Sequence, residues 1–136
     1  MATKGQFTGM RGVYLVAAEL SKLRLIASPT SRSAIGADIL ATDEECKNTY
    51  SIQVKTNATT FNFWLLNKDS KKLKSPTFIY VFVNLRDKKN LTEFFIVPNC
   101  IVSEKMHIEK NGESTWYSFS YEDAKQYENN WDIFKK

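Results

Sequence analysis

A run of apolar residues near the middle of the chain constrains the fold most strongly. The stretch Thr77–Leu85, with the sequence TFIYVFVNL, consists mostly of β-branched and aromatic residues. Such a run is typical of a strand buried on both faces, because a strand with one solvated face alternates apolar and polar side chains. The sequence therefore predicts a central strand at 77–85, with other elements packed against both faces of its sheet.

The rest of the chain supplies helices and further strands around this one. Apolar residues at three- and four-residue steps predict a first helix with Thr8 as its N-cap, whereas 1–7 should be flexible. Leu23–Ala27 fits either the end of that helix or the start of a strand. Further strands are expected at 37–41, 50–56, 62–66, 92–97 and, as a possible edge strand, 116–119. Short helices should follow Pro98 and Ser120, the second reaching about Asn129. The prediction is one domain, 1–136, of the α/β class bordering on α+β, with a central mixed sheet flanked by an N-terminal helix and C-terminal helices.

Bulk composition limits the functional classes only mildly. A chain of 136 residues can bury a real core, and 43% apolar with 25% charged residues is ordinary for a globular protein. The formal net charge of +4 favours an anionic partner, although solvated surface lysines explain it equally well. No apolar stretch resembles a signal peptide or a membrane span, so a cytoplasmic location without a membrane partner is the expectation.

Two common chemistries find little support. Cys46 and Cys100 lie far apart, outside any metal-ligand spacing, and are expected to be reduced thiols. His107 is the only histidine, and its neighbours in the segment KMHIE include no nucleophile. A Ser-His-Asp or Cys-His apparatus is therefore disfavoured.

A group of polar residues on two neighbouring strands is more informative. Asp38 lies within the apolar run at 37–41, where an acid is costly without a ligand or partner. The strand at 50–56 alternates, so Gln53 and Lys55 leave the sheet on one face. If the two strands pair through the polar loop 42–48, Asp38 lies beside Gln53 and Lys55. The oxygens of Asp38 and Gln53 could then ligate Mg²⁺, while Lys55 could hold a phosphate or polarise the attacking water.

Each of these residues also has a simpler interpretation. Asp38 and Lys55 could form an exposed salt bridge with Gln53 merely solvated. Glu19, at the border of the apolar stripe of the first helix, is the candidate for a second acid at the site. It could equally pair with Lys22, three positions further on.

Three short motifs add a family resemblance to this interpretation. Ala17-Ala18-Glu19-Leu20 on a helix, Gly36-Ala37-Asp38-Ile39 on a strand and Ile52-Gln53-Val54-Lys55-Thr56 on the next strand occur in that order. The region from Thr8 to about Pro98 thus resembles the PD-(D/E)xK nuclease superfamily, particularly its Mrr-like and archaeal Holliday-junction-resolvase-like branches.

That resemblance implies a fold, an activity and roles for four residues. The fold is the restriction-endonuclease-like core, and the activity is Mg²⁺- or Mn²⁺-dependent hydrolysis of DNA phosphodiester bonds. Glu19, Asp38 and Gln53 would hold the metal, and Lys55 would be the motif lysine. Two positions depart from the pattern. Ala37 stands where the family has proline, and the neutral Gln53, as in the Mrr-like variant, removes one negative charge from the metal site.

The remaining candidates concern binding partners. Two basic loops could grip DNA phosphates or simply solubilise the surface; their cations are Lys68, Lys71, Lys72 and Lys74 in one and Arg86, Lys88 and Lys89 in the other. The aromatic residues of the strands, Phe63 among them, are expected in the core rather than on a base-stacking platform. Trp116 and its aromatic neighbours in the C-terminal part could form a homodimer interface or a lid over the core. The predicted function is a DNA endonuclease, the alternative a catalytically inactive nucleic-acid-binding or protein-interaction module on the same fold.

Overall fold

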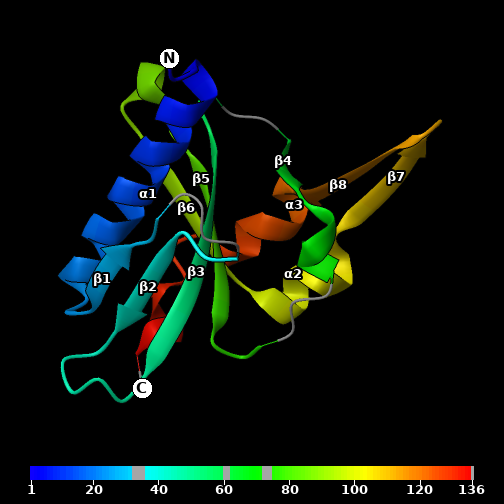
Figure 1. Cartoon of the computed structure of the whole chain (residues 1–136). Coiled ribbons are helices and arrows are strands. Elements are labelled where there is room, and N and C mark those ends of the chain that lie inside the picture. The colour runs from blue at the N-terminus through cyan, green and yellow to red at the C-terminus, as the bar shows by residue number, and fades with distance from the viewer. Residues whose placement is uncertain (32–35, 60–61, 72–74, 136) are drawn as a thin grey trace.

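The computed structural model describes residues 1–31, 36–59, 62–71 and 75–135 (Figure 1). It begins with the helix α1 (Lys4–Lys22). Thr3 caps this helix: its hydroxyl accepts from the backbone N–H of Gln6 at 3.2 Å, while the Gln6 side chain accepts from the Thr3 N–H at 2.8 Å. This reciprocal capping box satisfies N–H groups at the helix start, which would otherwise lack partners. The expected N-cap at Thr8 was therefore wrong, and residues 4–7 are helical rather than part of a flexible tail.

A mixed five-stranded sheet forms the centre of the molecule. Its strands lie in the order β1 (Ile26–Pro29), β2 (Ile39–Thr42), β3 (Thr49–Asn57), β5 (Phe78–Asn84) and β6 (Glu93–Pro98). The β3–β5 pair is parallel and the other pairs are antiparallel. Every residue of β5 is buried, which confirms the central strand expected from its apolar run. The ambiguous segment after α1 divides into a turn and the strand β1.

Two separate apolar cores cover the two faces of this sheet. On one face, Val16 and Leu20 of α1 pack with Ile52, Val54 and the alternating residues of β5, and the 3₁₀ turn Trp131–Phe134 completes this core through Phe134. The core on the other face contains Tyr80, Phe82 and Phe95 of the large sheet; its remaining members come from a smaller sheet and from short helices, and include Trp64, Val102, Phe119 and Ala124.

The smaller sheet is built from β4 (Phe63–Leu66), β7 (His107–Asn111) and β8 (Ser114–Ser120) in the order β4–β8–β7. The segment 116–119, expected at an edge, thus lies in the middle strand. Nothing in the sequence pattern had indicated β7. The β7–β8 hairpin extends away from the body of the molecule (Figure 1).

Short helices and turns complete the chain. The helix α2 (Asn99–Lys105) follows Pro98 as expected, and 3₁₀ turns occupy Lys68–Lys71, Asp87–Lys89 and Lys125–Tyr127. Ser120 caps α3 (Tyr121–Ala124) by accepting from the Asp123 N–H at 3.1 Å. This helix ends at Ala124 and not near Asn129, because a 3₁₀ turn replaces its continuation. The described helices include none with the length and apolar character needed to cross a membrane.

Candidate active site

The site forms where β2 begins beside β3. The two strands pair antiparallel with Ile39 opposite Ile52, so Asp38, one residue before β2, lies next to Gln53. The Asp38 N–H donates to the Ile52 carbonyl at 2.8 Å, and its own carbonyl accepts from the Thr30 N–H at 2.9 Å. Strand β3 continues to Asn57, past the start of β2, and therefore has an open edge at this point. The pairing of the predicted hairpin brings Asp38 and the Gln53–Lys55 strand together.

The Asp38 carboxylate occupies the first open position on that edge. Its Oδ2 accepts from the Val54 N–H at 2.8 Å, so the side chain replaces the next backbone partner of β3. No described residue donates a hydrogen bond to Oδ1. In an extended strand the N–H and the carbonyl of one residue point to the same side, so the Val54 carbonyl also faces this open edge. At this edge, Asp38 Oδ2 is engaged by the Val54 N–H, whereas Oδ1 and the neighbouring Val54 carbonyl could accept a ligand.

Gln53 and Lys55 share the face of β3 that looks toward the smaller sheet. Gln53 is half-buried, and its side chain makes no hydrogen bond to the described part of the chain. Lys55 is also half-buried and stands beside Phe82 of β5 in the parallel register. Burial lowers the pKa of the Lys55 ammonium below its ordinary value, and the negative charge of Asp38 partly offsets this effect. A lysine held in this way keeps a poorly hydrated cation near the carboxylate.

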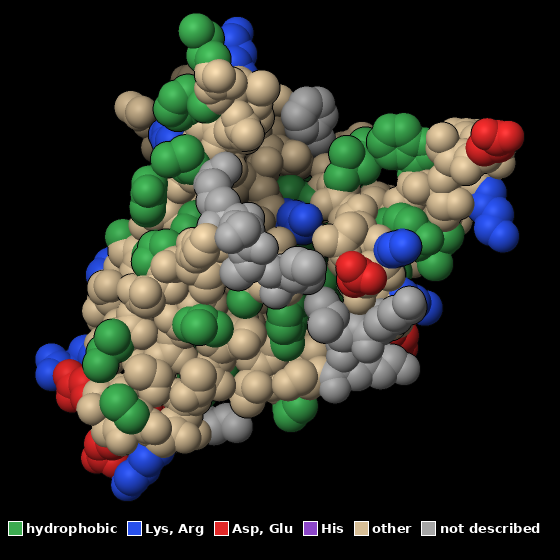
Figure 2. Space-filling model, in the orientation of Figure 1, with side chains coloured by type: hydrophobic (Ala, Val, Ile, Leu, Met, Phe, Trp, Pro, Cys, Tyr) green, Lys and Arg blue, Asp and Glu red, His purple; other side chains and the backbone are tan. Residues whose placement is uncertain are grey.

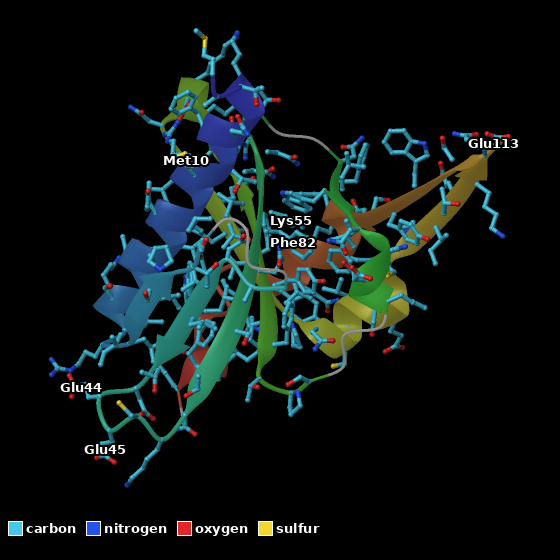
Figure 3. All side chains as sticks on the ribbon, in the orientation of Figure 1. Met10, Glu44, Glu45, Lys55, Phe82 and Glu113 are labelled. Carbon is cyan, nitrogen blue, oxygen red and sulfur yellow. The ribbon has the colours of Figure 1, made fainter. Side chains whose placement is uncertain are left out.

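Lys55 lies at the base of a hollow in the molecular surface. The cavity is lined by Lys55, Thr56 and Asn57 at the end of β3 and by residues 63–65 of β4. Figure 2 shows a basic side chain at the bottom of a hollow between the body and the smaller sheet, at the place where Figure 3 labels Lys55. An anionic ligand that enters this hollow would meet the Lys55 ammonium.

The wall on the other side of Asp38 comes from the first half of α1. Asp38 and Val54 line a second cavity together with Gly9, Met10 and Val13 of the helix. Nearby, the helix approaches β3 so closely that a side chain at Gly12 would overlap the Thr56 hydroxyl. This contact fixes the position of α1 along β3. At that position the helix turns Gly9, Met10 and Val13 toward Asp38, so the wall beside the carboxylate is apolar.

Glu19 is not part of this arrangement. It follows Val13 by six residues, which places it about 9 Å further along the helix axis. Its carboxylate lies 3.4 Å from the Lys22 ammonium, as in the simpler interpretation of its spacing. Among the described residues, no three His, Cys, Asp or Glu side chains gather as a metal site. Among the described residues that line the cavity beside Asp38, none is a second acid.

The other expected contacts have mixed outcomes. The ion pairs of the described residues do not include one between Asp38 and Lys55, so the salt-bridge alternative finds no support. Lys71 donates to the Ser103 carbonyl at 2.9 Å and thereby ties its turn to α2. Lys88 and Lys89 are exposed, whereas Lys72 and Lys74 lie outside the described residues. Cys46 and Cys100 are both free.

Two residues that help to form the site, Val54 and Gly12, were not expected from the sequence. The Val54 backbone carries no side-chain signal, although its place between Gln53 and Lys55 on an unpaired edge could have suggested it. Gly12 is one of three glycines in α1. A glycine inside a helix is unfavourable and often has a packing reason, so it was a usable signal.

Comparisons with known proteins agree with the architecture. No family model matches the chain, and no curated protein matches it. Among solved structures, it is similar to Hjc, a Holliday junction resolvase of Archaeoglobus fulgidus, with a TM-score of 0.57 and 14% identity over 87% of this chain and 88% of that one. It is also similar to the bacterial homing endonuclease I-Ssp6803I, with a TM-score of 0.59 and 11% identity over 98% of this chain and 91% of that one. The expected restriction-endonuclease-like fold is thus confirmed: the chain has the fold of these two nucleases.

Proposed function

We propose that the protein is a metal-dependent endonuclease that hydrolyses phosphodiester bonds in DNA. The single observation that carries the proposal is the Asp38 carboxylate, which the Val54 N–H holds at the open edge of β3 next to Gln53 and Lys55. Support from the fold comes from a resolvase and a homing endonuclease with the same architecture. A cytoplasmic location and a homodimeric state remain predictions.

The oxygen atoms at this edge suit a hard divalent cation. Asp38 Oδ1, the Val54 carbonyl and the Gln53 amide oxygen would hold Mg²⁺ or Mn²⁺, and Mg²⁺ keeps several water ligands in sites of this kind. Such an ion, when bound, lowers the pKa of a coordinated water and neutralises charge on the phosphate. Because this set contains a single carboxylate, we expect weak metal affinity and a requirement for millimolar metal.

The protein side chains perform the remaining tasks. Asp38, fixed through Oδ2, keeps Oδ1 in one orientation at the metal site. Lys55 directs its ammonium toward the phosphate and stabilises the negative charge that grows on its oxygens during hydrolysis. Burial of the lysine strengthens this effect, because an electrostatic interaction weakens less where water is excluded. Gln53 contributes an oxygen without charge.

Cleavage assays with plasmid and oligonucleotide substrates in Mg²⁺ and in Mn²⁺ test the proposal. Asp38→Ala and Lys55→Ala should each lower the cleavage rate by at least about 100-fold, the usual scale for removing one preorganised electrostatic group. Lys110→Ala, which removes an exposed lysine on β7, is the matched control and should cleave normally. Cleavage that survives both site substitutions would exclude this site as its source.

A second candidate is a nucleic-acid-binding module without turnover. The specific observation in its favour is the apolar helix wall beside Asp38, where the described lining residues include no second acid that could support a metal. Calorimetry separates the two functions. A pure binder gives a DNA-binding isotherm with no detectable binding of Mn²⁺, whereas the proposed nuclease binds Mn²⁺ and loses that binding in Asp38→Ala.

A further inference from the structure

The outward face of the smaller sheet carries large apolar side chains in the open. Trp64 and Phe119 pair across β4 and β8 and point into the core, so Phe63, Leu65 and Trp116 lie on the opposite face. These three side chains are 46%, 51% and 50% exposed. The expectation that Phe63 belongs to the core was therefore wrong: the alternation of β4 buries its neighbours and leaves it outside.

This face is continuous with the candidate active site. Phe63 and Leu65 line the cavity that contains Lys55 and Thr56. They also line a neighbouring cavity that extends across the smaller sheet to Trp116. The Asn57 side chain donates to the Phe63 carbonyl at 3.0 Å and so ties the end of β3 to the start of β4. Figure 2 shows hydrophobic side chains along the rim of the hollow on the side of the smaller sheet.

The spacing of the three apolar side chains suits separated planar groups. Phe63 and Leu65 are two residues apart on one strand, a step of about 7 Å. Leu65 pairs with Ser118, two residues from Trp116 on the adjacent strand, which gives a second step of about 8 Å. Both steps are about twice the 3.4 Å rise between stacked bases of one strand in a duplex. The face therefore fits bases that have left the stack.

Polar groups on the same face favour bases over phosphates. Glu109 lies opposite Trp116, and Ser118 and Ser120 lie beside Leu65 and Phe63. Hydroxyl and carboxylate oxygens can bond the edges of bases, for example the amino group of cytosine. Glu109 repels phosphates, so a bound strand would turn its backbone away from the hairpin and toward Lys55.

We propose that the outward face of the smaller sheet binds the bases of an unpaired DNA strand that continues from the active site. Phe63 and Trp116 stack against the bases, and Leu65 fills the space between them. The inference rests on the proposed function, whose substrate it narrows to DNA with a single-stranded segment beside the cleaved bond. Single-strand binding proteins use aromatic platforms of this kind.

Binding measurements without catalysis test this proposal. The full chain is titrated in EDTA with labelled oligothymidine of about ten nucleotides, within the range of known single-strand site sizes, and with a duplex of equal length. Phe63→Ala and Trp116→Ala should each weaken oligothymidine binding by roughly 5- to 100-fold, the range that loss of one base stack allows. Duplex affinity should change less than threefold, and Trp116→Phe should retain most of the single-strand affinity.

Ile108→Ala provides the matched control. Ile108 lies on the opposite face of the same hairpin with a similar exposure of 46%, so its truncation should leave single-strand binding unchanged. Equal binding by wild type and Trp116→Ala overturns the proposal, as does an equal loss in Ile108→Ala. Light scattering on the protein alone tests whether a second copy of the chain covers this face instead. A molecular mass that falls in Trp116→Ala and in no other variant would make the face an interface between copies and would also overturn the proposal.

Asp38→Ala separates this proposal from the proposed function. This variant should lose cleavage and keep oligothymidine binding, because Asp38 lines the cavity beside α1, whereas Phe63 and Trp116 line the cavities over the smaller sheet. A variant that still cleaves refutes the proposed active site while the binding result stands. A variant that loses single-strand binding as strongly as Trp116→Ala refutes the platform.

Discussion

The two walls beside Asp38 differ in how their positions are determined. The wall formed by β3 is positioned by backbone pairing, because the register of β2 against β3 is enough to place Asp38 next to Gln53 and Lys55. The wall formed by α1 is positioned by side-chain packing, which fixes both the rotation of the helix and its position along the sheet. A strand pairing has few possible registers when one face is buried, whereas a helix can lie at many heights on a sheet. This difference explains why the Asp38 group formed as expected and Glu19 did not join it.

The contact between Gly12 and Thr56 holds the helix at its height, and its removal should give the largest effect on stability. A Cβ at Gly12 would lie 2.9 Å from the Thr56 Cβ, closer than real contacts allow. We expect Gly12→Ala to lower the free energy of unfolding by about 2 kcal/mol, the cost of overpacking, in spite of the better helix propensity of alanine. Urea unfolding followed by circular dichroism measures the change.

Gly5→Ala is the matched control on the same helix. An added Cβ there would meet only the Thr3 hydroxyl at 3.8 Å, so we expect unchanged or slightly higher stability. Thr56→Ala should partly restore Gly12→Ala. Equal stability of the two glycine variants would show that α1 can shift along β3, so that the Gly12 contact would not hold Glu19 away from Asp38.

The same contrast accounts for what the sequence could and could not predict. The strand β5 was predictable because seven of the nine residues from Thr77 to Leu85 are apolar, and such a run can be buried only in the middle of a two-sided sheet. The alternation of β3 likewise placed Gln53 and Lys55 on one face. The site of contact on α1 was not predictable, because its apolar stripe runs past both Val13 and Glu19 and carries no mark of which turn meets Asp38. The exposure of Phe63 was not predictable either, because it depends on a second sheet, and the strand β7 of that sheet is exposed and lacks the alternation of apolar and polar residues that would have indicated it.

An acid placed on the turn of α1 that faces Asp38 should give the next largest effect, an increase in metal affinity. Met10 lines the cavity beside Asp38, and Figure 3 labels it on the first half of the helix. We expect Met10→Glu to tighten Mn²⁺ binding about tenfold, because a second carboxylate adds a charged oxygen ligand to a site with one. Isothermal titration calorimetry measures the affinity.

Glu19→Gln is the control for that gain and should leave Mn²⁺ affinity unchanged. Met10→Gln tests whether charge, rather than size, causes the improvement, and it should gain little. A loss of Mn²⁺ affinity in Glu19→Gln as large as that in Asp38→Asn would place Glu19 at the metal after all.

The smallest expected effect concerns the cost of burying Lys55. Because its pKa is lowered in the folded state, the unfolded chain binds more protons at this group, and stability rises with pH between the lowered pKa and the ordinary value of 10.5. Below that window the charged lysine destabilises the fold. We therefore expect Lys55→Met to raise the free energy of unfolding at pH 7 by on the order of 0.5–1 kcal/mol, as substitutions that relieve functional strain often do, while it abolishes cleavage. The stability advantage of Lys55→Met should shrink as the pH approaches 10.5.

Thermal unfolding at several pH values measures this stability difference, with Lys110→Met as the exposed control that changes little. A Lys55→Met protein less stable than wild type at pH 7 would mean that the attraction to Asp38 outweighs desolvation, and Lys55 would then be a structural partner of the carboxylate rather than a cation held ready for phosphate.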